Sequence, residues 1–183
     1  MSAVSTARAS NQGKRTARPG KYLTFALGAE EYGLEILKVR EIIGYVPVTA
    51  VPRTPEHVLE VINLRGQVIP VVDLRVRFGL ERAERTEKTC FIVAEVADGS
   101  RSVCTGLMVD CVCEVREISG DQIDPAPDFG SEVEDDFIMG MAKVGSEVKI
   151  LLDIDKVLTA TEVAGVVHKA QEIEEEQGDG AGL

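Results

Sequence analysis

The run VINLRGQVIPVVDLRVRFG, residues 61–79, carries most of the information about how this chain folds. Two stretches rich in β-branched residues flank Leu64-Arg65-Gly66, and such residues favour strands. Gly66 can take the positive φ that a tight turn requires. The run therefore predicts strands over 58–63 and 67–73, joined by a turn at the glycine.

Similar short runs recur on both sides of this hairpin, separated by turn residues. They predict strands over 22–27, 32–36, 90–96, 103–109, 112–118, 137–144 and 148–152. Pro47 and Pro52 should confine the extended segment 46–51 to a sheet edge, because proline cannot donate to a ladder. Many short strands with little helix indicate a mainly β fold, a barrel or a sandwich.

Two segments favour helix. Val39, Ile42 and Ile43 recur at i, i+3 and i+4, which predicts a short helix or turn over 37–43 that stops at Gly44. Residues 153–167 carry apolar side chains at helical spacing and predict a helix near the C-terminus.

The net charge of −11 lies in the central part of the chain. Residues 1–20 are basic and residues 169–183 are acidic, and neither segment shows apolar periodicity, so both are expected to be disordered tails around a folded region, 21–168. A folded body this acidic would repel phosphate backbones, which argues against nucleic acid as a partner. No apolar run is long enough to span a membrane, and no signal peptide is evident, so the expected location is the cytoplasm.

The residues offer no catalytic set, cofactor motif or metal site. The two histidines, His57 and His168, are far apart, and no P-loop, nucleophile elbow or zinc-protease motif occurs. The four cysteines have neither C-x-x-C spacing nor a nearby histidine, and are expected to be reduced thiols. We therefore expect no enzyme activity.

Arg65 at the turn leaves two interpretations open: an exposed charge, or a guanidinium that holds a carboxylate.

The run at 58–80 resembles the centre of the CheW family of chemotaxis coupling proteins. Four more blocks, in the same order, resemble other parts of that family: 31–42, 51–55, 106–110 and 150–155. Together the five blocks cover about residues 21–160, nearly the whole expected folded region.

The resemblance implies two small five-stranded SH3-like β-barrels packed on a shared apolar core. It also implies an adaptor that couples the cytoplasmic tips of transmembrane, methyl-accepting chemoreceptors to the regulatory domain of a CheA-type histidine kinase. Such an adaptor is not inserted into the membrane but recruited to its inner face through receptor arrays. A coupling protein of a non-motility pathway is an alternative, and a small-ligand-binding β-barrel is a more distant one.

The resemblance also implies site residues. A receptor-binding groove would use Leu23, Ile36, Val39, Ile42 and Val112. Glu41 and Arg65 match family positions that bear a carboxylate and an arginine close together, which predicts an ion pair beside the turn glycine, Gly66.

The chain departs from the family pattern at one informative position. Glu60 precedes Val61 where the family usually has glycine, so the kinase-contact region expected around Glu60 and Asn63 differs in bulk and charge. This difference would suit a copy that pairs with its own kinase.

Overall fold

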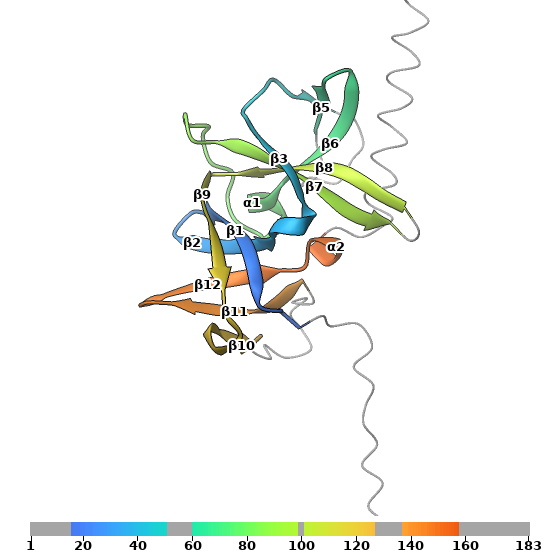
Figure 1. The fold of residues 1–183 in the computed structure, drawn as a ribbon. Helices are drawn as coiled ribbons and strands as arrows, with labels where there is room; N and C mark the ends of the chain where they lie inside the picture. The colour runs from blue at the N-terminus through green and yellow to red at the C-terminus, as the bar shows by residue number, and fades with distance from the viewer. Residues whose placement is uncertain (1–15, 51–59, 99–100, 127–136, 158–183) are drawn as a thin grey trace, which may run out of the picture.

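The computed structural model describes residues 16–50, 60–98, 101–126 and 137–157 (Figure 1). They form two six-stranded sheets with very little helix, which confirms the mainly β expectation, although each sheet has six strands rather than five. Sheet A has the order β10 (Ile123–Pro125), β11 (Ile138–Val144), β12 (Glu147–Leu152), β2 (Glu30–Glu35), β1 (Gly20–Leu27), β9 (Cys111–Ile118). Sheet B has the order β3 (Val39–Gly44), β7 (Cys90–Asp98), β8 (Arg101–Val109), β6 (Gln67–Asp73), β5 (Glu60–Leu64), β4 (Thr49–Ala50).

Short helical turns connect the strands. They are the 3₁₀ turns η1 (Ile36–Lys38) and η2 (Gly120–Gln122) and the α-helical turns α1 (Leu74–Arg77) and α2 (Ile154–Val157). The Asp73 side chain caps α1 by accepting a hydrogen bond from the Arg75 N–H at 3.0 Å. The helix expected over 153–167 is therefore seen as α2 at its start, and its remainder lies outside the described residues.

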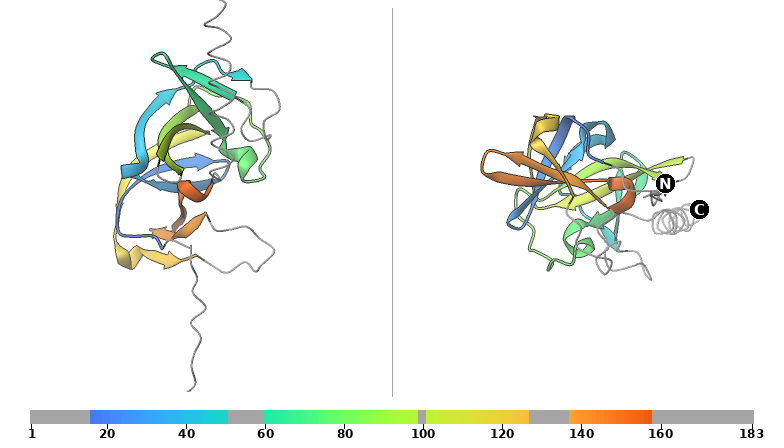
Figure 2. Two further views of the ribbon diagram at one scale, coloured as in Figure 1. Left: turned by 90° about the vertical axis from the view of Figure 1, so that its right-hand side faces the viewer. Right: turned by 90° about the horizontal axis from the view of Figure 1, so that it is seen from below.

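The chain enters sheet A, leaves it and returns. After β1 and β2 it builds all of sheet B, and a single residue, Asp110, separates β8 of sheet B from β9 of sheet A. Sheet A is completed when β12 pairs in parallel with β2, where Lys149 lies opposite Glu31. Figure 2 shows the two sheets from two further directions. Sheet A therefore joins both ends of the described chain.

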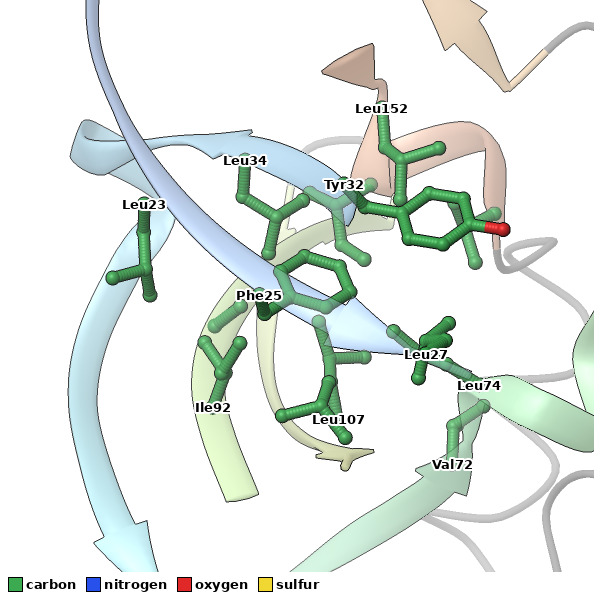
Figure 3. Packing of buried hydrophobic residues seen from close by; sticks show 14 of the residues in the cluster. Leu23, Phe25, Leu27, Tyr32, Leu34, Val72, Leu74, Ile92, Leu107 and Leu152 are labelled. Carbon is green, nitrogen blue, oxygen red and sulfur yellow. The ribbon is translucent and has the colours of Figure 1, made fainter. Parts of the chain in front are cut away.

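Three apolar clusters hold this arrangement together. The largest lies between the sheets and is built from β1, β2 and β12 on one side and β6, β7 and β8 on the other. Figure 3 shows Phe25, Leu34 and Leu152 pointing toward Ile92 and Leu107. Smaller clusters belong to sheet A, around Tyr22, Ile118 and Leu151, and to sheet B, around Ile62, Phe91 and Val93. Each sheet therefore has its own core and shares another.

The hairpin at the centre of the sequence forms as expected. Leu64 pairs with Gln67, which leaves Arg65 and Gly66 as a two-residue loop. Both loop residues have positive φ, 54° and 84°, as a type I′ hairpin turn requires. The Asn63 Oδ1 accepts a hydrogen bond from the Gly66 N–H at 2.9 Å and closes the turn. At the edge of sheet B, β4 forms within the segment 46–51.

The prediction of a helix or turn over 37–43 is wrong for most of the segment. The 3₁₀ turn ends at Lys38, and residues 39–44 form strand β3. The ladder between β3 and β7 shifts register between Val39 and Glu41, as at a β-bulge. The shift places Val39 and Ile42 on one face, opposite Ala94 and Ile92 of the inter-sheet cluster. A bulged strand thus produces the i, i+3 spacing that the sequence attributes to a helix.

The predicted N-terminal boundary at residue 20 is also wrong, because the segment 16–20 belongs partly to the folded structure. Ala17 is buried in the core of sheet A, and its N–H donates to the Met139 carbonyl at 3.2 Å. The Tyr22 hydroxyl donates to the Arg18 carbonyl at 2.6 Å. Residues 1–15 and the expected acidic tail, 169–183, lie outside the described residues.

Candidate partner-binding surfaces

An apolar strip crosses the seam between the two sheets. Three of its members, Ile36, Val39 and Val112, are half-buried against the inter-sheet cluster. The fourth, Ile42, shares a face with Val39 and is 46% exposed. We call these four residues the apolar strip. Three of the five residues expected in the receptor-binding groove therefore lie at the surface of the inter-sheet cluster, and Ile42 lies on the same face of β3 as Val39.

Leu23, the fifth expected groove residue, cannot touch a partner in this structure. It is 1% exposed and forms part of the inter-sheet core. Its strand neighbour Val115, on β9, is 53% exposed and lies on the same face of sheet A. Leu23 thus supports the surface from beneath, while Val115 extends the exposed apolar area.

Val115 is not among the groove residues that the family resemblance implies, and it follows a bulge in β9. The ladder between β1 and β9 shifts register between Thr24 and Phe25, so Phe25 lies opposite Val112 and Thr24 lies opposite Glu114. In an unbulged strand, residues three apart face opposite sides. Here the extra residue, Cys113, returns Val112 and Val115 to the same face.

Leu37 is a second apolar residue that the sequence analysis did not select. It lies on η1, between the strip residues Ile36 and Val39, and is 91% exposed. Its neighbour Lys38 donates to the Asp155 carboxylate of α2 at 2.8 Å, which ties this turn to the end of the described chain. A large aliphatic side chain so exposed on an anchored turn is available for contact with a partner.

Glu41 and Arg65 form a two-point ion pair at one end of sheet B. Arg65 Nη2 donates to Glu41 Oε2 at 2.9 Å, and Arg65 Nη1 donates to Glu41 Oε1 at 3.3 Å. Glu41 lies on β3, not on a helix, and Arg65 occupies the β5–β6 turn. Since β3 is one edge strand of the sheet, the pair links that edge to the β5–β6 hairpin, three strands away in the sheet order.

A hollow of about 260 Å³ lies beside this ion pair. Its wall includes Arg40, Glu41, Arg65 and Gln67, whereas Leu64, Ile69, Val93 and Cys104 supply apolar surface. Arg40 pairs with Glu95 on the same side. The ion pair thus forms part of the rim of a depression in sheet B.

Glu60 and Asn63, the two residues of the expected kinase-contact region, differ from each other in their surroundings. Glu60 is half-buried and lines a hollow of about 100 Å³ together with Asp73, Arg82 and Arg85. Burial raises the pKa of Asp73, although backbone N–H groups at the start of α1 oppose that shift. Asn63 is exposed, but its side-chain oxygen closes the hairpin turn. Glu60 therefore adds a carboxylate to a charged hollow, and Asn63 has a local structural role.

Within the described residues, no group of three or more His, Cys, Asp or Glu side chains could hold a metal ion. Nor does any helix in the described ranges have the length and apolar character to cross a membrane. The four cysteines are free thiols, and burial raises the pKa values of the Cys90 and Cys113 thiols.

Two sheets around a shared core, with an apolar strip and an ion pair at the surface, define a mainly β domain without a metal site among the described residues. The model of the CheW-like domain matches residues 21–162. The chemotaxis protein CheW of Klebsiella aerogenes is 40% identical over 151 residues, which cover 82% of this chain and 89% of that protein. The CheW of Rhizobium meliloti is 37% identical, with 83% and 96% covered.

A solved structure supports the same assignment. The scaffolding protein TtCheW from Thermoanaerobacter tengcongensis matches with a TM-score of 0.68 and 34% identity, covering 76% of this chain and 92% of that one. The chain belongs to the CheW family.

Proposed function

We propose that this chain is a non-catalytic adaptor that couples transmembrane chemoreceptors to a CheA-type histidine kinase in chemotaxis signalling. Membership of a family of chemotaxis scaffolding proteins supports this role. In this proposal the protein acts in the cytoplasm and reaches the inner face of the membrane through receptor arrays. The kinase would contribute its regulatory domain, and the receptors their cytoplasmic tips.

The observation that carries the proposal is the apolar strip. Val39 and Ile42 come from β3 of sheet B, Val112 comes from β9 of sheet A, and Ile36 lies in the turn between β2 and β3. A helical receptor tip laid along this seam would contact both sheets at once. Aliphatic side chains at such spacing fit the apolar face of an amphipathic helix.

The ion pair gives the receptor-facing end of the proposed groove an ordered element. Arg65 has φ of 54°, a conformation uncommon for a residue other than glycine, asparagine or aspartate. Two hydrogen bonds to Glu41 hold its side chain while the turn fixes its backbone. A surface ordered before binding loses less conformational entropy on contact with a partner. We propose the kinase contact separately, in the region of Glu60 and Asn63.

The test separates receptor binding from kinase binding with Ile42→Glu and Val39→Glu. Ile42 is the safer site because it is already half exposed, so a carboxylate should leave the fold intact. An unpaired carboxylate desolvated beneath a receptor helix should weaken receptor binding at least tenfold, about 1.4 kcal/mol. Binding of the kinase regulatory domain, measured with the same preparations, should stay within about twofold, which is below 1 kcal/mol.

Val148→Glu is the matched control, since Val148 is 49% exposed but belongs to neither proposed surface. Thermal melts of all variants distinguish lost contacts from lost stability, which matters most for the half-buried Val39. A folded Ile42→Glu variant that binds receptor like the unmodified chain, or that loses both partners equally, would rule out the strip as the receptor site.

A further inference from the structure

Strand β9 is an edge of sheet A with an unusual sequence pattern. Within the described part of the chain, it pairs with β1 alone. Its central residue, Val115, is 53% exposed, and the residues on either side, Glu114 and Arg116, carry opposite charges. An exposed edge strand presents unpaired backbone groups to which another strand can add.

The direction of the backbone groups in β9 follows from two hydrogen bonds. The Glu114 N–H donates to Thr24 Oγ1 at 3.2 Å, and the Thr24 hydroxyl donates to the Glu114 carbonyl at 3.0 Å. Both backbone groups of Glu114 therefore face β1. Because successive residues of a strand point these groups to alternate sides, those of Val115 point outward, away from β1.

The charges around Val115 are self-complementary. If a second β9 lay antiparallel with Val115 opposite its own copy, Glu114 of each strand would lie opposite Arg116 of the other. Opposite charges placed directly across two strands stabilise their pairing. In the single chain, Arg116 Nε already donates to Glu114 Oε1 at 2.9 Å, so these side chains lie within reach of one another. Two copies would create a four-charge cluster around the valine pair.

We propose that two copies of this chain associate through β9, antiparallel and centred on Val115, to join two A sheets into one continuous sheet. The twofold axis passes between the two valines, whose N–H and carbonyl groups exchange a pair of hydrogen bonds. The contact is isologous, as closed dimers require. One strand pair buries little area, so the dimer is weak and forms reversibly. This inference does not depend on the proposed coupling function.

The test uses sedimentation equilibrium of the isolated full chain over a wide concentration range. Glu114→Arg alone, or Arg116→Glu alone, places like charges across the axis and should weaken the dimer at least about tenfold. The double variant restores opposite charges in exchanged positions, so it should recover the dimer to within about threefold, less than 1 kcal/mol. Net charge alone does not predict this pattern, because Glu114→Arg and Arg116→Glu change it in opposite directions, yet both should weaken the dimer.

Val115→Lys provides an independent test, because it places two ammonium groups next to each other at the twofold axis of the dimer. It should abolish the dimer, whereas Val148→Lys, at a valine of similar exposure outside β9, should not. Thermal melts establish that each variant is folded. A chain that is monomeric throughout, a dimer that tolerates Val115→Lys, or a double variant as weak as the single ones would overturn the proposal.

Discussion

Arg75 donates two nearly parallel hydrogen bonds to Asp110, from Nε to Oδ1 at 2.7 Å and from Nη2 to Oδ2 at 2.5 Å. Asp110 also accepts a bond from the Gly28 N–H at 2.8 Å. Arg75 lies in α1, just after β6, Gly28 lies between β1 and β2, and Asp110 is the residue at which the chain crosses between the sheets. One carboxylate therefore joins three segments of both sheets.

Asp110→Asn should lower the free energy of unfolding by about 1–3 kcal/mol at neutral pH, because it removes a charge-assisted pair. The hydrogen bond from Arg75, aided by the Gly28 N–H, lowers the pKa of Asp110. A carboxyl with a lowered pKa in the folded state stabilises the fold above its unfolded pKa, about 3.9, and that contribution disappears as pH falls through the folded value.

Urea unfolding of both proteins between neutral and acid pH checks this expectation. The difference in unfolding free energy between the two chains should shrink as the pH falls below about 4. A difference that stays constant down to the most acidic pH would show that Asp110 contributes through packing and not through its charge.

Gly33→Ala should destabilise the protein by about 1–3 kcal/mol through overpacking. A Cβ at this position in β2 would lie 2.9 Å from Leu151 Cδ2 and 3.6 Å from Tyr22 Cβ. Both neighbours are fully buried, so neither side chain can turn into solvent. Gly44→Ala is the matched control: Gly44 is also in a strand, but a Cβ there meets nothing within 4 Å. Equal melting temperatures for the two variants would contradict this account.

Truncation should distinguish residues 1–15 from residues 16–20. Removing residues 1–20 deletes the buried Ala17, its bond to Met139 and the carbonyl that receives the Tyr22 hydroxyl. We expect this chain to lose about 1–3 kcal/mol of stability relative to one that lacks only residues 1–15, whose sequence offers no apolar periodicity. Chemical denaturation of the two truncated chains measures the difference directly, and identical midpoints would mean that the 16–20 contacts are not stabilising.

The ion pair should influence signalling more than stability. Arg65 is largely exposed, with 77% of its side chain accessible, so the pair should contribute only about 0–1 kcal/mol to unfolding. A double-mutant cycle with Glu41→Ala and Arg65→Ala, read as kinase control in the complex with receptor, should show an interaction term above about 0.5 kcal/mol. Strictly additive losses would mean that the two residues act separately.

The sequence predicts those structural features that depend on residues close together in the chain. The hairpin at Arg65 and Gly66 follows from local turn chemistry and β-branched flanks, and its strands lie close to the expected ranges. The segment 37–43 was misassigned because a bulge depends on pairing with another strand, and a single sequence does not show that pairing. The bulge in β9, which brings Val112 and Val115 to one face, likewise depends on pairing with β1.

Burial that depends on contacts between residues far apart in the sequence is the second feature that the sequence does not predict. Ala17 lies in a polar, basic segment, and only its contact with the core of sheet A, 122 residues along the chain at Met139, makes it part of the fold. The proximity of Glu41 and Arg65 was expected from the family resemblance, because two residues 24 positions apart carry no local signal of contact. The hydrophobic pattern thus identifies strands, whereas their mutual contacts determine which side chains reach the surface.

The pairing of β2 with β12 also determines the order in which the two sheets can form during translation. Glu31 and Lys149 are 118 residues apart in the chain. At roughly 5–20 residues per second, the β1–β2 hairpin waits about 6–24 s for its last neighbour. Sheet B, whose strands are consecutive, can close in that interval. Val112 emerges only after all of sheet B, so a nascent chain cannot present a complete apolar strip to a partner until most of the protein has been translated.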